Sequence, residues 1–110
     1  MQEPTFFILT ALAEQPRHGY GIIQAVAGLS GGRIKLRAGT LYAALDRLTA
    51  AGLVSFDREE AVEGRLRRYY RLADDGVDAL AKEVARLQAN ASLAAARIRP
   101  HGTRSALGPA

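Results

Sequence analysis

The last third of this chain carries apolar residues at alternating intervals of three and four positions, which is the spacing of one stripe along a continuous helix. The stripe consists of Val77, Leu80, Val84, Leu87, Ala91, Ala94 and Ile98. A helix this long buries such a stripe only in part when it folds back on a small domain, so the pattern predicts a dimerisation helix over residues 74–99. Asp74 or Asp75 is expected to cap the helix, and Pro100 to end it. Residues 100–110 are expected to form a disordered tail.

The upstream part of the chain has the pattern of three short helices followed by two strands. The predicted elements are helices over residues 5–14, 19–27 and 39–51, a very short strand at 34–36, and strands over 53–56 and 66–72 that flank a charged loop at 57–64. Thr5 is expected to cap the first helix and Gly52 to end the third. This order is that of a winged helix-turn-helix. The predicted fold is therefore mainly α with a small two-stranded β-wing over residues 1–73, followed by the long C-terminal dimerisation helix.

The composition favours an anionic partner and excludes several classes of site. The net charge is +4 and the isoelectric point is about 10.0, although a basic solvated surface fits these values equally well. The absence of cysteine excludes disulfides and thiolate metal sites, and His18 and His101 are too isolated from each other to predict a zinc cluster. No stretch is long enough to span a membrane and no export signal is recognisable, so a cytoplasmic location without a cofactor is expected.

The outward side of the third predicted helix has the character of a surface that enters a DNA groove. With Leu41, Leu45 and Leu48 facing the core, the other side presents Thr40, Ala43, Ala44 and Arg47, with Tyr42 at its flank. Small residues beside a hydroxyl, an aromatic ring and a cation suit close approach to base edges in the major groove. An ordinary solvated helix face is the alternative interpretation.

Basic residues alternate along the segment that precedes this helix, at Arg33, Lys35 and Arg37. Cations at a helix amino end oppose the helix dipole. A phosphate bound there would remove the conflict, because both the helix amides and the cations favour an anion. The segment is therefore expected to bind the DNA backbone.

The second predicted strand of the wing is crowded with arginines, at Arg65, Arg67, Arg68 and Arg71. A wing tip in this fold lies against the DNA backbone or minor groove, where the potential is most negative. Arg65 and Arg67 are the stronger candidates for that contact. The alternative is a set of cross-strand ion pairs with the acids of the loop, Glu59, Glu60 and Glu63. Tyr69 and Tyr70 are expected to pack against the helices.

Three segments resemble the PadR family of regulators, in the right order and over roughly residues 5–98. Residues 18–22 (HGYGI) resemble the start of its second helix, and residues 39–48 (GTLYAALDRL) with 52–54 (GLV) resemble its recognition helix. Residues 64–72 (GRLRRYYRL) with Gly76 resemble its wing and the entry to its last helix.

The resemblance implies a homodimeric transcription factor, usually a repressor, of the compact form with a single C-terminal dimerisation helix. It also implies that the first helix packs against that of the partner subunit, and that Tyr42 and the start of the third helix face the operator. The sequence departs from the common pattern at three positions. Ala43 stands where proline is common, Arg37 stands where serine or threonine often caps the recognition helix, and Ala73 replaces a usual threonine.

The pattern and the resemblance together predict a sequence-specific DNA-binding repressor that binds an inverted-repeat operator as a homodimer. The expected DNA-binding residues are Lys35, Arg37, Gly39, Thr40, Tyr42, Ala43, Arg47, Arg65 and Arg67. The alternative is a winged-helix protein interaction module without DNA binding. No nucleophile motif or phosphate-binding loop points to an enzyme.

A small-molecule effector of unidentified chemistry stays open, since some relatives bind flat aromatic drugs or phenolic acids between subunits. Phe6, Phe7 and Tyr20 could line a pocket for it, but core packing is the stronger interpretation of these rings. The chain has no tryptophan, so an indole-lined cradle is not expected.

Overall fold

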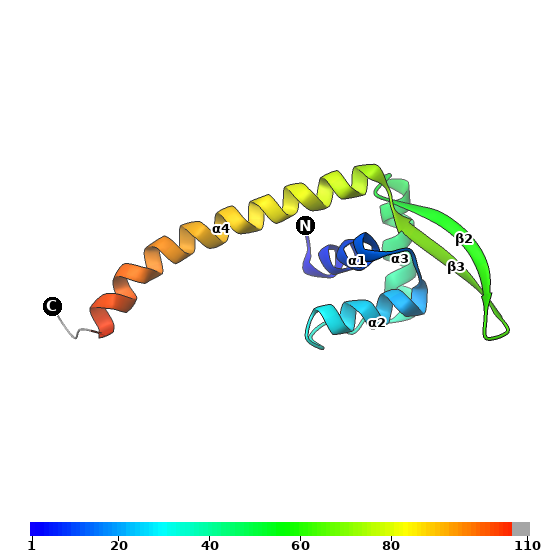
Figure 1. Ribbon diagram of the computed structural model, residues 1–110, viewed down its shortest axis with the longest axis horizontal. Helices are drawn as coiled ribbons and strands as arrows, with labels where there is room; N and C mark the ends of the chain where they lie inside the picture. The colour runs from blue at the N-terminus through cyan, green and yellow to red at the C-terminus, as the bar shows by residue number, and fades with distance from the viewer. Residues whose placement is uncertain (107–110) are drawn as a thin grey trace. The chain divides into compact units, whose positions relative to one another are not determined.

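The computed structural model describes residues 1–106, and the side chains of residues 1–98. The chain forms two units, of which the first is Met1–Leu80 and the second begins at Ala81. The elements are α1 (Glu3–Glu14), β1 (Arg17–His18), α2 (Gly19–Leu29), α3 (Ala38–Ala50), β2 (Val54–Val62), β3 (Arg65–Leu72) and α4 (Asp74–Ala106) (Figure 1). This is the predicted winged helix-turn-helix followed by a long helix. None of the described helices is long and apolar enough to cross a membrane.

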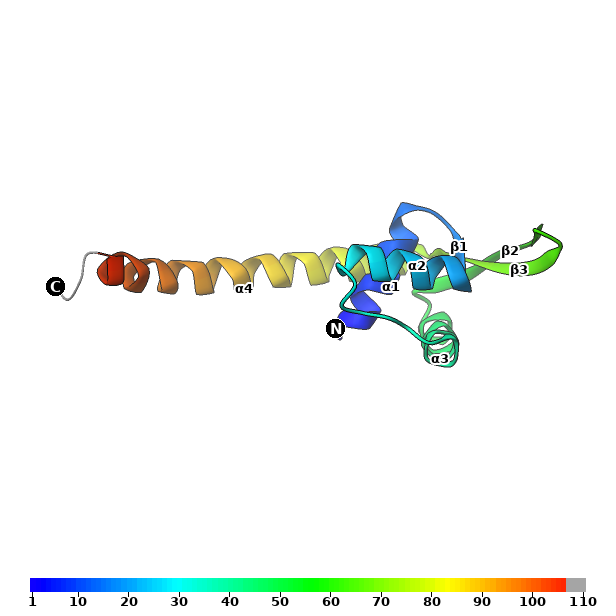
Figure 2. The same cartoon turned by 90° about the horizontal axis from the view of Figure 1, so that it is seen from below.

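Three short helices of the first unit share one apolar core. Each supplies side chains that are fully or almost fully buried, and β2 and β3 close the core with Val54 and Tyr70. The buried helical residues are Ile8, Leu9, Ala11 and Leu12 from α1, Ile22 and Val26 from α2, and Leu41, Ala44, Leu45 and Leu48 from α3. The helices α2 and α3 cross and do not run parallel, since Figure 2 shows α3 end-on and α2 from the side. The predicted inward face of α3, with Leu41, Leu45 and Leu48, is confirmed.

The sheet has three strands in the order β1-β3-β2, and all pairs are antiparallel. The prediction of two short strands with a charged loop at 57–64 is wrong, because β2 pairs with β3 as far as Val62 opposite Arg65. The connecting turn is only Glu63 and Gly64, with φ of 51° and 77°, which is the conformation of a tight two-residue hairpin. Charged residues without apolar alternation resemble a loop in sequence, but cross-strand contacts hold them in an extended ribbon.

Two further boundaries differ from the sequence prediction. Thr5 does not cap α1, because the helix begins at Glu3 with Pro4 in its first turn, where the missing N–H of proline has no cost. Residues 34–36 form no strand, and the short strand lies instead at Arg17–His18, where its partner is β3.

The boundaries of the last helix also differ from the prediction. Asp74 and Asp75 lie inside the first turn of α4 and do not precede it. Pro100 does not end α4, which continues to Ala106. An interior proline removes one backbone hydrogen bond and crowds the preceding turn, but the helical conformation of α4 continues past it. The disordered tail was expected over residues 100–110, but residues 100–106 belong to α4, and 107–110 lie outside the described residues.

The start of α2 is capped by the side chain of His18. Its Nδ1 accepts a hydrogen bond of 3.1 Å from the backbone N–H of Gly21, so this nitrogen carries no proton. The imidazole also lies edge-on to the ring of Tyr69, with ring centroids 5.3 Å apart. Burial first, and the charge of Arg67 second, lower the pKa of His18 below its ordinary 6.5. The folded protein therefore favours neutral His18.

The first turn of α4 packs closely against the loop that precedes β2. A side chain at buried Gly76 would overlap with the backbone carbonyl oxygen of Leu53 and would lie 2.7 Å from Cδ1 of Leu72. That carbonyl also accepts a hydrogen bond of 3.0 Å from the backbone N–H of Ala73. The glycine thus allows the first turn of α4 to pack directly on the backbone at Leu53.

We predict that Gly76→Ala lowers the free energy of unfolding by about 2–3 kcal/mol, because a methyl group there displaces backbone. The measurement is urea denaturation followed by circular dichroism. Gly28→Ala is the matched control, since a Cβ at Gly28 meets nothing within 4 Å and should leave stability equal or higher. Equal stability of the two variants would contradict the packing described here.

We also predict that the free energy of unfolding falls as the pH is lowered from about 7.5 to about 5. The unfolded state has the ordinary pKa of histidine and binds a proton more readily than the folded state, so the stabilisation is complete above that pKa and is lost below it. The decline should be shallower in His18→Asn, which keeps a capping oxygen but does not titrate. Denaturation at a series of pH values measures both proteins, and parallel curves would refute the role of His18.

Candidate nucleic-acid interface

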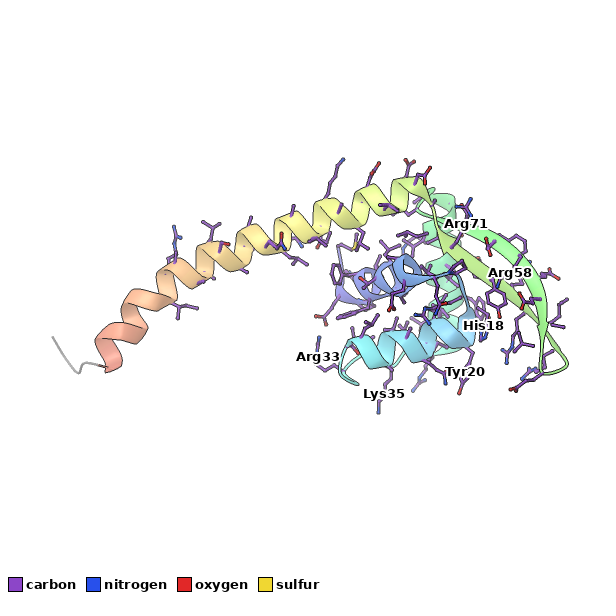
Figure 3. All side chains as sticks on the ribbon, viewed as in Figure 1. His18, Tyr20, Arg33, Lys35, Arg58 and Arg71 are labelled. Carbon is purple, nitrogen blue, oxygen red and sulfur yellow. The ribbon has the colours of Figure 1, made fainter. Side chains whose placement is uncertain are left out.

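The segment before α3 holds two basic side chains without counter-charges. Lys35 and Arg37 are exposed and form no ion pair with any described residue, and Lys35 projects away from the helices (Figure 3). Arg37 is the N-cap residue of α3, and its side chain makes no capping hydrogen bond. The amino end of α3 therefore presents free backbone N–H groups and cations together, which is a suitable place for an anion.

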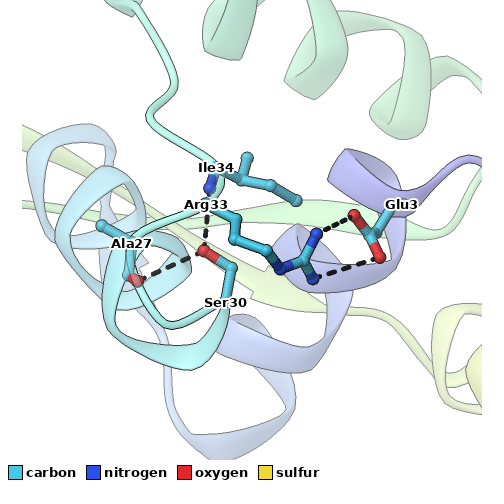
Figure 4. Close-up of polar contacts among 5 residues, drawn as sticks. All are labelled: Glu3, Ala27, Ser30, Arg33 and Ile34. Carbon is cyan, nitrogen blue, oxygen red and sulfur yellow. Dashed lines mark hydrogen bonds and ion pairs between the residues drawn. The ribbon is translucent and has the colours of Figure 1, made fainter.

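Arg33, the first basic residue of this segment, has a different role. Its guanidinium donates to both carboxylate oxygens of Glu3 at 2.9 and 3.3 Å, which lowers the pKa of Glu3 and raises that of Arg33 (Figure 4). Nearby, the buried hydroxyl of Ser30 donates to the carbonyl of Ala27 and accepts from the N–H of Ile34. The bonds of Ser30 stabilise the loop that leads into α3. The charge of Arg33 is neutralised within the protein by Glu3.

The outward side of α3 matches the sequence prediction with one correction. Thr40, Ala43 and Arg47 are exposed, but Ala44 is only 7% exposed and belongs to the core. Ala44 lies three positions after Leu41 and four before Leu48, so the helical repeat turns it inward. The face that remains outside is a narrow strip of small and polar residues with one arginine.

Tyr42 lies at the edge of this strip and contacts the first residue of α2. Its hydroxyl occupies the place where a side chain at Gly19 would begin, and Gly19 is buried. Tyr42 as a whole still has 44% of its surface exposed. The glycine of the HGY sequence thus admits Tyr42, and α2 fixes the position of the tyrosine hydroxyl.

Gly39, in the first turn of α3, has no reason within the protein to be glycine. A Cβ there would meet nothing within 4 Å, and its φ is not positive. Glycine in a helix is less favourable than alanine by about 1 kcal/mol, so the residue weakens α3 without improving any described contact.

The arginines of the wing divide into paired and unpaired sets. Arg58 lies 2.5 Å from a carboxylate oxygen of Asp57 and 2.7 Å from one of Glu60, and its guanidinium stacks 4.1 Å from the centre of the Tyr69 ring. Arg68 lies 4.0 Å from Glu59 and stacks on Phe56, and Arg71 lies 4.0 Å from Asp57. The pairs of Arg68 and Arg71 join β3 to β2, as in the alternative of cross-strand ion pairs, whereas Arg58 pairs with acids of its own strand.

Arg65 and Arg67 are the unpaired set, and neither forms an ion pair within the described part of the chain. They project to the same side of β3, because strand residues two apart share a face. The Nε of Arg67 is buried without a hydrogen-bond partner. Tyr69 follows on this side, and Tyr70 on the other is buried, as predicted for a packing residue.

A cleft of about 510 Å³ separates the start of α1 from the outward side of α3. Gln2 and Thr5 line it from α1 and its N-cap, and Thr40, Ala43 and Arg47 line it from α3. The guanidinium of Arg47 donates a 3.4 Å hydrogen bond to the hydroxyl of Thr5 and forms no ion pair with a described residue. Sequence reasoning missed Gln2 and Thr5, because no local pattern indicates that these residues reach the outward side of α3.

The stripe predicted on the last helix is solvent-exposed along the second unit. Val84 and Leu87 have 38% and 41% of their surface exposed, and Ile98 has 66%. Leu80 differs, because it packs against the core of the first unit. The apolar stripe beyond Leu80 therefore has no cover within its own unit.

The chain is similar in sequence and fold to known transcriptional regulators. The family model described as "Transcriptional regulator PadR-like family" matches residues 8–82. A PadR-like transcription factor of Bacteroides fragilis is 30% identical, with a TM-score of 0.65, and the match covers 81% of this chain and 84% of that one. A protein of Lysinibacillus sphaericus known as uncharacterized protein X is 29% identical over 69 residues, and the match spans 63% of each chain.

Two further solved structures share the fold. A PadR family transcription regulator of Clostridium difficile has a TM-score of 0.74 and 21% identity, and the match covers 88% of this chain and 99% of that one. Bacillus subtilis PadR, solved in complex with operator DNA, has a TM-score of 0.66 and 23% identity, over 76% of this chain and 47% of that one.

Proposed function

Because the chain belongs to the PadR-like family of transcriptional regulators, we propose that it represses transcription by binding an inverted-repeat operator as a homodimer. In this proposal the recognition surface is the outward side of α3, with Gly39, Thr40, Tyr42, Ala43 and Arg47. The flanking cations Lys35, Arg37, Arg65 and Arg67 bind phosphates.

The observation that carries the proposal is the distribution of unpaired cations. Arg33, Arg58, Arg68 and Arg71 each have a carboxylate within 4.0 Å, whereas Lys35, Arg37, Arg65 and Arg67 have none among the described residues. These four cations flank α3 in the chain, just before the helix and on the wing that follows it, while Lys82 and Arg97 of α4 also have no ion pair among the described residues. A polyanion that binds α3 would meet these charges, since phosphate contacts position a DNA-binding protein and base contacts specify the sequence.

Homodimerisation follows from the apolar stripe of α4. A single helix cannot cover its own stripe, and a second copy offers an identical one. A two-fold dimer recognises an inverted repeat with half-sites about one helical turn apart or somewhat more. The operator complex of Bacillus subtilis PadR supports DNA as the partner, since that relative has the same fold.

The competing function is a winged-helix module that binds another protein. The unpaired cations favour DNA, and salt dependence separates the two functions sharply. A cytoplasmic location fits either.

We predict that the Gln variants of Lys35, Arg37, Arg65 and Arg67 each reduce the slope of log Kobs against log salt concentration by about two per dimer. Each substitution removes one phosphate contact from each subunit, and affinity should fall about equally on operator and random DNA. Gel-shift titrations at several salt concentrations measure both quantities. Arg58→Gln is the matched control, because its charge is neutralised by Asp57 and Glu60, and its slope should stay within one of the wild type.

The double variant Arg37→Ala, Arg65→Ala decides between the two functions. Unchanged affinity and slope in this protein would mean that the DNA surface lies elsewhere, and the protein interaction module would then be the better proposal.

We predict that Val84→Glu with Leu87→Glu converts the dimer to a monomer and abolishes high-affinity operator binding. Each side chain contributes roughly 1.5–3 kcal/mol gross when fully buried, and glutamates facing each other would repel. Leu80 is unsuitable for this test, because it also packs against the core. Ala89→Glu, on the opposite side of the same helix turn, should stay dimeric. Sedimentation equilibrium at micromolar concentration gives the masses, and a monomeric wild type would refute the dimer.

A further inference from the structure

We propose that the cleft between α1 and α3 seats the sugar–phosphate backbone of the bound DNA, with Arg47 and the hydroxyl of Thr5 binding one phosphate in each half-site. The inference rests on the proposed function and adds a contact to it. It assigns Arg47 to phosphate, not to a base edge, and it adds α1 to the DNA surface.

The first support is the chemistry of the cleft. One wall is part of the outward side of α3, so any strand that α3 approaches lies beside the opening. Polar side chains ring the rim, with a cation from Arg47 and hydroxyls from Thr5 and Thr40. The lining also includes two apolar side chains, buried Ile8 and half-buried Leu36. Donors and a cation above an apolar lining match a phosphate attached to a deoxyribose.

The second support is the state of Arg47. Its hydrogen bond to Thr5 is to a neutral oxygen at 3.4 Å, so the guanidinium has no strong acceptor within the described residues. Charged hydrogen bonds to phosphate are shorter and stronger than such a contact. The bond to Thr5 holds the guanidinium at the cleft until a phosphate arrives.

The third support is Gly39, which also lines the cleft. The helix would be more stable with alanine, and the space beside Gly39 is empty of protein atoms. A missing side chain at this point leaves room for the close approach of a second backbone. DNA supplies such a backbone.

A small effector molecule fits the cleft less well. Most of its lining residues, including Gln2, Pro4 and Thr40, are exposed to solvent. Sites for small ligands bury most of the ligand surface, which this lining does not allow. A polymer held by contacts on both sides of the cleft needs no such enclosure.

The first test compares Gly39→Ala with Gly28→Ala in the full chain. Both glycines lie in helices with open space around them, so both alanines should raise the midpoint of thermal unfolding by a few degrees. Only Gly39→Ala should weaken operator binding, by about tenfold or more. Wild-type affinity in Gly39→Ala would overturn the inference.

The second test replaces single phosphates of the operator with neutral methylphosphonates, one position at a time. At one phosphate per half-site, the methylphosphonate should lower the affinity of the wild-type protein but cause no further loss in Arg47→Gln. The effects of the two changes are then not additive, because both remove the same contact. Thr5→Val should show the same pattern with a smaller loss, whereas Thr49→Val, on α3 but outside the cleft, should behave as wild type. If the affinity losses from the methylphosphonate and from Arg47→Gln are fully additive at every phosphate, Arg47 binds no phosphate and the inference is wrong.

The failure of this inference is distinguishable from failure of the proposed function. If wild-type protein does not bind the operator with salt-dependent affinity, the proposed function is wrong. If it does bind and the Arg47 and Gly39 variants match it, only the backbone seat is wrong. An Arg47→Gln protein that loses sequence preference but keeps its salt slope would assign Arg47 to a base, which also overturns the seat.

Discussion

Burial of Leu41, Leu45 and Leu48 in the core that α3 shares with α1, α2 and the sheet is the interaction on which the rest of this structure depends. These leucines take one side of a 13-residue helix, so the helical repeat leaves Thr40, Ala43 and Arg47 on the other. The helix α3 also passes the start of α2. The contact is possible because Gly19 has no side chain, and the hydroxyl of Tyr42 occupies that space. The core thus decides which surface of α3 is available to DNA.

Charge pairing then selects among the basic residues. The carboxylates of the described part of the chain are distributed so that some arginines are neutralised in place while others have no partner. Arg58 illustrates the first group, held by Asp57 and Glu60 and stacked on Tyr69, and it stiffens the wing. Arg65 illustrates the second, with its charge left for an external anion. Exposed pairs add little to stability, so their main effect here is on which charges remain.

The glycines separate requirements of the fold from requirements of function. Gly76 and Gly19 admit neighbouring protein atoms, and Gly64 adopts a positive φ at the tip of the wing. Gly39 does neither, and a residue that lowers helix stability without a structural reason points to a partner. Only the tertiary structure separates these roles, because all four residues are glycine in the sequence.

The sequence by itself determined the order of the four helices and the two wing strands, the inward leucines of α3 and the stripe on α4, since all three depend on local periodicity and on helix-breaking residues. It also favoured Arg65 and Arg67 over Arg68 and Arg71 as DNA contacts, which stays a prediction, and in the structure Arg68 and Arg71 lie 4.0 Å from Glu59 and Asp57. It misjudged the charged ribbon after Phe56 and placed a strand at 34–36, because strand pairing is a contact between distant segments. Only the tertiary structure brought Thr5 beside Arg47, 42 positions apart, and buried Ala44. Such proximity is set by how three helices pack, which no local pattern encodes.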